Sequence, residues 1–374
     1  MSESTVFVGM DVHRDWVSLA TLRGSARECD DVRTVPYDVA KLKRFFERLR
    51  EPGVAVHACY EASGMGFTLF RALREMGVAC MVAAPSLIPQ RPGDHCKTDK
   101  RDAAKLAHFL RAGELVAVVV PDEAHERVRA LTRCRETFSR EARSSRHHVV
   151  KFLAVQGVVF RDGRQWTQAH WRWLRAVRLE GPAQRAFDAY LALLDFKLSR
   201  LAEIDKELEA LAPNVPFAGA VARVRCLRGF DTVGAMTVAA EICDARRFES
   251  PRHLMAFFGL TVSERSTGGP AAKQRMGGIT KAGNSRCRRL LVEAAWHYRH
   301  PPRTSRALAK RRDGQPADVV AHAERAQHRL HRRFHRLSER MIPARAAVAV
   351  ARELTGFLWA VMRGEPALLL ARPR

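Results

Sequence analysis

The order of strands and helices over residues 5–120 limits the fold of this chain more than any other feature. Two β-branched apolar runs, residues 5–12 and 16–22, are separated by a short polar turn and predict a hairpin. Helical periodicity then alternates with short apolar runs, so we expect helices over 39–50, 65–76 and 99–110 and strands over 54–62, 79–84 and 115–120. This order predicts an α/β domain with a mixed sheet and helices on its faces.

Four carboxylates stand out in this α/β region. Asp11 ends the first expected strand and Glu61 the third, while Asp99 and Asp102 share one face of a helix that Thr98 is placed to cap. A carboxylate at a buried strand end is unfavourable unless a cation or hydrogen bonds compensate it. Each acid alone could serve a turn, a loop or a helix start. Together they predict oxygen ligands for one or two Mg²⁺ ions.

The charge of the chain indicates its class of partner. The net charge is +24 and the pI about 10.7, mostly from arginine, whose planar fork suits phosphate. A nucleic-acid partner is the leading interpretation, and a ribosome-associated protein or an anionic membrane surface are the alternatives. No apolar run reaches the length of a membrane span, the first residues lack a signal-peptide pattern, and the eight cysteines form no C-x-x-C pair. We therefore expect a soluble cytoplasmic protein without a zinc site or disulfide framework.

The middle and the end of the chain have helical patterns. Residues 123–213 are expected to form a helical, coiled-coil-like arm, because leucines and one isoleucine recur every three or four residues between Leu191 and Leu211. This stripe predicts either a dimerisation arm or a helical hairpin packed within one chain. Residues 322–341 are dense in arginine and histidine without clear metal-ligand spacing, and we interpret them as a nucleic-acid or subunit surface.

The stretch from residue 214 to about 300 carries the other candidate chemistry. Residues 226–242 have the form of a helix-hairpin-helix, in which Gly229 and Gly234 would let the backbone approach phosphates. Two adjacent hydroxyls, Ser266 and Thr267, precede a glycine-rich basic segment; they are candidate nucleophiles, or they only hydrogen-bond the turn. The candidate phosphate-binding residues of this segment are Lys273, Arg275, Lys281, Asn284, Arg286, Arg288 and Arg289.

Three segments, MDVHRDWVSLA, CYEASGMGFTLFRAL and APSLIPQRPGDHCKTDKRDAAKLAHFLRAGEL, resemble the N-terminal part of DEDD-type transposases of the insertion-sequence-110 family. Residues 227–295 resemble the C-terminal transposase domain of that family. The resemblance implies a ribonuclease-H-like (RuvC-like) domain in which Asp11, Glu61, Asp99 and Asp102 bind two Mg²⁺ ions. It also implies a serine that attacks DNA and forms a phosphoserine intermediate; we assign this role to Ser266, with Thr267 as the alternative.

The same resemblance implies partners and a division of the chain. The expected partners are double-stranded DNA, a structured guide (bridge) RNA, and further copies of this chain, in a dimer or tetramer with composite active sites. The expected parts are a metal-binding domain (1–122), a coiled-coil arm (123–213), a mostly α transposase domain (214–300) and a basic helical tail (301–374). Two rival functions remain open: a resolvase-like endonuclease that uses metal-activated water, and a nucleic-acid-binding protein without catalysis.

Overall fold

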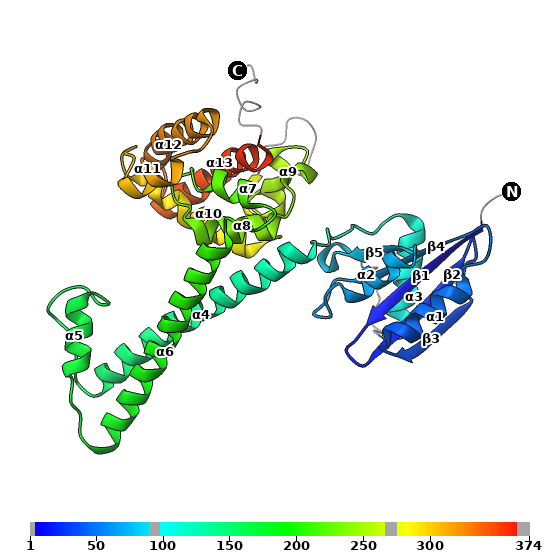
Figure 1. The fold of residues 1–374 in the computed structure, drawn as a ribbon, viewed down its shortest axis with the longest axis horizontal. Coiled ribbons are helices and arrows are strands. Elements are labelled where there is room, and N and C mark those ends of the chain that lie inside the picture. Colours follow the sequence, from blue (N-terminus) through cyan, green and yellow to red (C-terminus); the bar gives the residue numbers. More distant parts are fainter. Residues whose placement is uncertain (1–3, 90–97, 266–274, 365–374) are drawn as a thin grey trace. The chain divides into compact units, whose positions relative to one another are not determined.

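The computed structural model describes residues 4–89, 98–265 and 275–364, and the chain divides into two compact units, Met1–Val120 and Pro121–Arg374. The first unit is the expected α/β sheet domain, and the second is mostly helical (Figure 1). The strands of the first unit are β1 (Ser4–Val12), β2 (Trp16–Arg23), β3 (Asp31–Pro36), β4 (Val54–Glu61) and β5 (Ala79–Ala83). Its helices are α1 (Val39–Leu49), α2 (Thr68–Glu75) and α3 (Asp99–Ala112), with a 3₁₀ turn at Pro85–Leu87.

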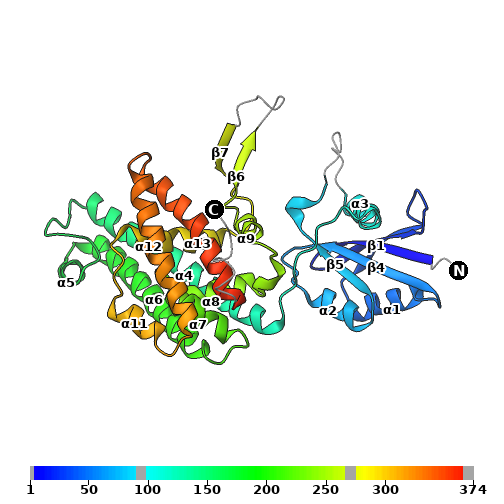
Figure 2. The ribbon, with the colours of Figure 1, turned by 90° about the horizontal axis from the view of Figure 1, so that it is seen from above.

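The sheet has the order β3-β2-β1-β4-β5 and is mixed, as expected. β1, β2 and β3 pair antiparallel, whereas β1, β4 and β5 pair parallel. Because side chains alternate along a strand, Val6, Val8 and Met10 of β1 enter one buried cluster, which also contains Phe46 of α1 and Leu73 of α2. The opposite face of β1 packs against α3, so helices cover both faces (Figure 2).

Two local predictions for the first unit were wrong. Residues 115–120 were expected to form a strand, but they contribute only an isolated antiparallel bridge between Ala83 and Ala117. The edge strand β3 was missed, because its residues alternate poorly and are mostly exposed or half-buried, so the burial pattern that marks a core strand is absent. Neither difference changes the position of the strand ends at Asp11 and Glu61.

The second unit begins with a long helical hairpin. Its elements are α4 (Glu123–Val155), α5 (Gln168–Ala176), α6 (Gly181–Leu211), α7 (Ala218–Val224), α8 (Thr232–Ile242), α9 (Pro251–Phe257), β6 (Val262–Arg265), β7 (Arg275–Ile279), α10 (Ser285–Trp296), α11 (Arg306–Arg312), α12 (Ala317–Ser338) and α13 (Pro343–Arg363), with 3₁₀ turns at Ala245–Arg247 and His297–Arg299. α4 and α6 lie side by side (Figures 1 and 2). Arg135 of α4 binds Asp205 of α6 with two hydrogen bonds of 2.7 and 3.1 Å, and Leu194 is fully buried between them. A hairpin within one chain is therefore present.

Helices α7, α8, α9, α10, α12 and α13 contribute to one hydrophobic core, whereas Leu174 of α5 packs in the separate cluster of α4 and α6. A buried ionic network lies at the edge of this core: the carboxylate of Glu241, 3% exposed, accepts hydrogen bonds from Arg133 at 2.7 and 3.0 Å and from the Asn284 amide at 2.8 Å. Arg129 lies 3.8 Å from the same carboxylate. Among the helices that the structure describes, none is both long and apolar enough to cross a membrane.

Candidate metal centre

Asp11 and Glu61 lie at the carboxyl ends of two neighbouring parallel strands. The last register pair of β1 and β4 is Met10 with Tyr60, and the next residue of each strand is acidic, Asp11 in β1 and Glu61 in β4. Since side chains alternate along a strand, Asp11 and Glu61 lie on the same face of the sheet as Gly9 and Cys59. This is the face that α3 covers. The sheet therefore brings the two acids to one edge and one face.

α3 starts at this same edge and supplies the other two acids. Its first residue is Asp99, and Thr98 caps it by accepting a hydrogen bond from the backbone N–H of Arg101 at 3.4 Å. The helix lies very close to β1 because Gly9 has no side chain: a Cβ there would lie 2.0 Å from the carbonyl oxygen of Ala103. This close approach positions the start of α3 beside the end of β1.

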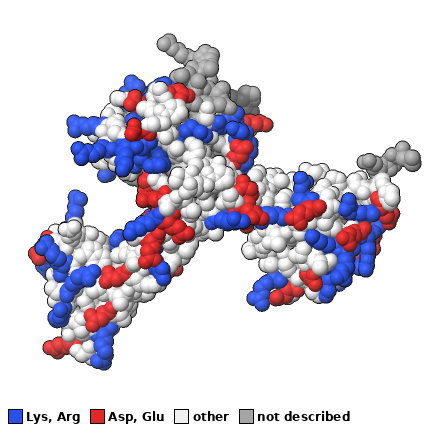
Figure 3. All heavy atoms as spheres, viewed as in Figure 1, with Lys and Arg blue, Asp and Glu red and all other residues white. Residues whose placement is uncertain are grey.

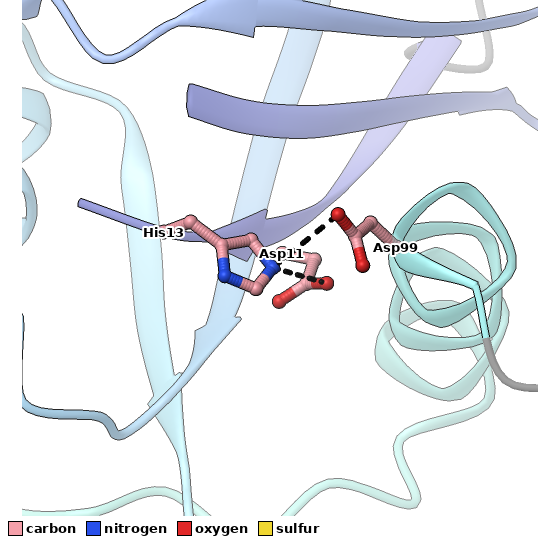
Figure 4. A group of neighbouring side chains, drawn as sticks. All are labelled: Asp11, His13 and Asp99. Carbon is pink, nitrogen blue, oxygen red and sulfur yellow. Dashed lines mark hydrogen bonds and ion pairs between the residues drawn. The ribbon is translucent and has the colours of Figure 1, made fainter. Parts of the chain in front are cut away.

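Three side chains meet at the edge. Oδ2 of Asp11, Nε2 of His13 and Oδ2 of Asp99 come from the end of β1, the β1–β2 turn and the start of α3 (Figure 4). The imidazole Nε2 lies 3.2 Å from Asp11 Oδ2 and 3.5 Å from Asp99 Oδ2. The potential ligand atoms of this group all lie within 4.8 Å of one another. Glu61 and Asp102 are not members of that group, although both lie in the described part of the chain.

The electrostatics of the edge disfavour a bare Asp11 carboxylate. Burial raises the pKa of Asp11 above its ordinary value of 3.8; nearby His13 opposes the shift, and the charges of Asp99 and Asp102 add to it. Asp102 itself accepts a hydrogen bond from the Lys105 ammonium at 3.3 Å, one helical turn away. A cation between Asp11 and Asp99 would remove the repulsion that these acids exert on each other.

The donor set fits a divalent cation. Two carboxylates suit Mg²⁺ or Mn²⁺, and an imidazole nitrogen adds a donor that Mn²⁺ accepts more readily than Mg²⁺. Asp11 and Asp99 are the residues that would bind the ion directly, and Asp11 is only 24% exposed. Asp102 and Glu61 lie on the adjoining helix turn and strand end, where they extend the acidic edge.

Two residues of this centre were missed by the sequence analysis. His13 lies two residues after Asp11, and the indole N–H of Trp16 donates to Asp99 Oδ2 at 3.1 Å. The rings of His13 and Trp16 are 5.2 Å apart, so each restricts the other. The D-x-H spacing around the turn could have indicated His13. The contact between Trp16 and Asp99 spans 83 residues and has no sequence signal.

The structure gives several of the predicted phosphate-binding residues internal partners. Arg286 and Arg289 of α10 both bind Glu136 of α4, at 2.6 and 3.3 Å, and each stays about two-fifths exposed. The guanidinium of Arg288 donates to the carbonyl oxygen of Phe258 at 2.8 Å. Lys281 is exposed in the loop before α10. Ser266, Thr267 and Lys273 lie outside the described residues, and of Arg275 only the backbone, in β7, is described.

The turn between α7 and α8 packs inward at its first glycine. A Cβ on Gly229 would lie 2.7 Å from Ala294 of α10, so this glycine is required by helix packing. The N–H of Gly234 donates to the Asp231 carboxylate, which caps α8 at 2.7 Å. Asn284 caps α10 through its side-chain oxygen, which accepts from the Cys287 N–H at 3.0 Å. Each of the three residues thus has a contact within the unit, and their nucleic-acid role stays a prediction.

Known proteins match both halves of the chain. A family model described as transposase matches residues 8–155, and one described as the transposase IS116/IS110/IS902 family matches residues 221–309. The candidate transposase y4qE of Sinorhizobium fredii is 41% identical over 362 residues, which is 96% of this chain and 88% of that protein. The transposase for insertion sequence element IS1533 of Leptospira borgpetersenii is 33% identical over 335 residues, 89% of this chain and 96% of that protein.

Proposed function

This chain belongs to the IS116/IS110/IS902 family of insertion-sequence transposases, and on that premise we propose that it cuts and rejoins DNA strands by phosphoryl transfer. The observation that carries the proposal is the meeting of Asp11, His13 and Asp99 at the sheet edge, with Asp102 and Glu61 beside them. The net charge of +24 supports a polyanionic substrate. The substrate is double-stranded DNA at the ends of the element and at its target.

The proposed cofactor is Mg²⁺, held by Asp11 and Asp99 with Glu61 and Asp102 as further oxygen ligands. Bound ions of this kind activate a hydroxyl and stabilise the leaving oxygen during phosphoryl transfer. The chain's own residues prepare the centre: the Trp16 N–H holds Asp99, and the capped start of α3 fixes Asp99 relative to Asp11. The donor set and the raised pKa of Asp11, which burial causes, support a resident cation.

The proposed nucleophile is the hydroxyl of Ser266, with Thr267 as the alternative. Its oxygen forms a bond to a DNA phosphorus, the strand oxygen leaves with a proton, and a protein–DNA phosphoester results. Attack by a strand hydroxyl on that phosphoester reverses the chemistry and joins new partners. A primary hydroxyl is less crowded than a β-branched one, which favours Ser266. The basic segment that follows, including Lys281, would bind the neighbouring phosphates.

The proposal includes a fold for each of two domains and a division of the chain into four parts. The sheet order β3-β2-β1-β4-β5, with an antiparallel half and a parallel half, supports a ribonuclease-H-like (RuvC-like) domain over residues 1–122. The α7–turn–α8 unit supports a helix-hairpin-helix in a transposase domain over residues 214–300. Residues 123–213 serve as the arm and residues 301–374 as a basic tail.

We further propose that several copies act together in the cytoplasm, with active sites that combine residues of two copies and with a guide RNA. The outer face of α6 supports the oligomer, because Ala189, Ala192, Leu193 and Phe196 are exposed at helical spacing along it. Leu193 is 44% and Phe196 54% exposed, more than a coiled-coil seam leaves open in the assembled state. The strong positive charge supports binding of a polyanion, which RNA is, but it does not distinguish RNA from DNA.

Substitution of the two hydroxyls tests the proposal against its rivals. We expect Ser266→Ala, or the double Ser266→Ala/Thr267→Ala variant, to abolish cleavage of element-end DNA in Mg²⁺. Retained cleavage by the double variant would assign the reaction to metal-activated water and make the protein a nuclease. If Asp11→Ala leaves every activity of the wild-type protein intact, the metal centre is not catalytic and the protein only binds nucleic acid.

A further inference from the structure

A cavity of about 1000 Å³ lies in the second unit between the start of α9 and the middle of α12 and α13. Its apolar lining, called the floor below, comes from Pro251, Met255, Ala321 and Phe357. The ring of His322, which also lines the cavity, packs against Phe357 at 5.0 Å, and the His322 Nε2 lies 3.3 Å from the Phe357 carbonyl oxygen. The floor is therefore fixed by buried contacts, and the cavity is a built feature of the unit.

The rim of the cavity is basic. Arg325, Arg329 and Arg332 follow each other at spacings of four and three along α12 and share one face of that helix, and Arg252 faces them from α9. Figure 3 shows Lys and Arg gathered over the part of the second unit that α11 and α12 form. These four arginines all line the cavity.

Carboxylates neutralise only part of this rim. Glu353 binds Arg329 and lies 3.7 Å from Arg333, and Glu324 lies 3.6 Å from Arg312. Both acids of the rim thus have arginine partners already. Arg252, Arg325 and Arg332 are exposed and have no carboxylate partner within the described ranges.

A ligand for this cavity needs two properties. Three uncompensated guanidinium groups around one opening repel each other and favour a ligand with several negative charges along its length. The apolar floor favours a flat, largely apolar group, because such a group gains free energy when it is buried away from water. Single-stranded nucleic acid has both, since its phosphates are spaced along a backbone and its unpaired bases can enter a pocket. In duplex DNA the bases are stacked and paired, so a duplex could contact only the rim.

We propose that this cavity binds an unpaired segment of nucleic acid, with a base against Met255 and Phe357 and its phosphates on Arg252, Arg325 and Arg332. The proposal rests on the proposed function, in which nucleic acid is the substrate and the guide. The volume lies at the upper end of the range of small-ligand pockets, roughly 300–1,000 Å³, and leaves room for a nucleoside and its neighbours. An unpaired DNA strand and an RNA loop offer the same chemistry.

The test uses the full-length protein and fluorescein-labelled 12-nucleotide single strands, as DNA and as RNA, followed by fluorescence anisotropy across a salt series. The variant is Arg252→Ala/Arg325→Ala/Arg332→Ala. The matched control removes three exposed arginines of the same unit that neither line the cavity nor lie in residues 322–341, Arg185→Ala/Arg306→Ala/Arg345→Ala. Thermal unfolding of both variants verifies that they are folded.

We expect the cavity variant to bind both single strands at least tenfold more weakly than the wild-type protein at physiological salt. Its slope of log affinity against log salt should fall by about 2, because each lost phosphate contact on a single strand removes about 0.7. Binding of a 12-base-pair duplex should change less than threefold. The control variant should lose less than threefold on every probe, because none of its three arginines lines the cavity.

A strand that carries abasic sites has the same charge and tests the floor. We expect it to bind wild-type protein at least fivefold more weakly than the intact strand, in line with base stacking energies. Equal binding of the abasic strand, equal losses in the two triple variants, or an equal loss on duplex DNA would each overturn the proposal. A preference between DNA and RNA identifies which strand occupies the cavity. The binding result is independent of DNA cleavage, so it stands or fails separately from the proposed reaction.

Discussion

The contact between Gly9 and α3 makes the geometry of the candidate metal centre testable without changing any of its candidate ligands. In Gly9→Ala the new Cβ would lie 2.0 Å from the Ala103 carbonyl oxygen and 2.4 Å from the Ala107 nitrogen. Optimal van der Waals contact is at about 3.5 Å, so α3 would have to move outward by at least about 1 Å. Because Asp99 is the first residue of α3 and Asp11 is on β1, the shift separates the two ligands.

Two measurements should change together in Gly9→Ala. Overpacking of this size costs about 1–3 kcal/mol of unfolding free energy, which a urea titration resolves. A displacement of about 1 Å from the productive geometry can reduce a reaction rate on the order of 10²-fold. Cleavage of element-end DNA should therefore fall steeply, and Mn²⁺ affinity by calorimetry should fall with it, because the two candidate ligands move apart.

Gly64→Ala is the matched control for this prediction. Gly64 lies in the same unit, close in sequence to Glu61, and a Cβ there would meet nothing within 4 Å. Its stability, Mn²⁺ affinity and cleavage should stay near those of the wild-type protein. If Gly9→Ala keeps wild-type stability and Mn²⁺ affinity, the close packing of β1 and α3 does not position the centre and the reasoning fails.

Three further predictions follow from other contacts. Glu241→Gln leaves Arg129 and Arg133 without their buried counter-charge and should lower the unfolding free energy by about 3–5 kcal/mol in chemical denaturation. Burial raises the pKa of Glu241, but Arg133, Arg129 and Asn284 together outweigh burial and lower the pKa below 4.5. This stabilisation is therefore present above pH 4.5 and lost as pH falls; an acid-unfolding difference between variant and wild type that does not change with pH would contradict it. Asp11→Asn should raise the melting temperature of the metal-free protein at pH 7–8, because burial raises the pKa of Asp11 and the stability that comes with its protonation is lost as pH rises above about 3.8. The same variant should lose the increase in melting temperature that added metal causes. A lower melting temperature of the metal-free variant would count against a strained carboxylate. Trp16→Phe keeps a ring beside His13 but removes the N–H donor to Asp99, and should weaken Mn²⁺ binding about tenfold by calorimetry, whereas unchanged affinity would show that this hydrogen bond does not orient Asp99.

The sequence predicted those parts of the structure that depend on local periodicity. The strands that carry Asp11 and Glu61 near their ends were found because they are short apolar runs, and α3 was found from its helical pattern and the cap at Thr98. The long helix α6 was expected from its repeated leucine stripe, and α4 from the polar, helical pattern that begins at Glu123. These patterns are determined by neighbours along the chain, so they can be read without tertiary contacts.

The remaining features depend on contacts between distant residues. The Trp16–Asp99 hydrogen bond joins positions 83 apart, and the roles of Gly9 and Gly229 follow from helices that pack against them. The hairpin of β6 and β7 was missed because each strand is only four or five residues long. Such features are specified by packing, which a one-dimensional pattern does not contain.

Covalent trapping tests the central claim most directly. The protein would be incubated with Mg²⁺, element-end DNA and the RNA transcribed beside the element, then resolved on a denaturing gel and mapped by mass spectrometry. The account predicts a protein–DNA adduct on Ser266 or Thr267 that is absent in Asp11→Ala. Cleaved DNA without any adduct would contradict it and assign the reaction to an activated water molecule.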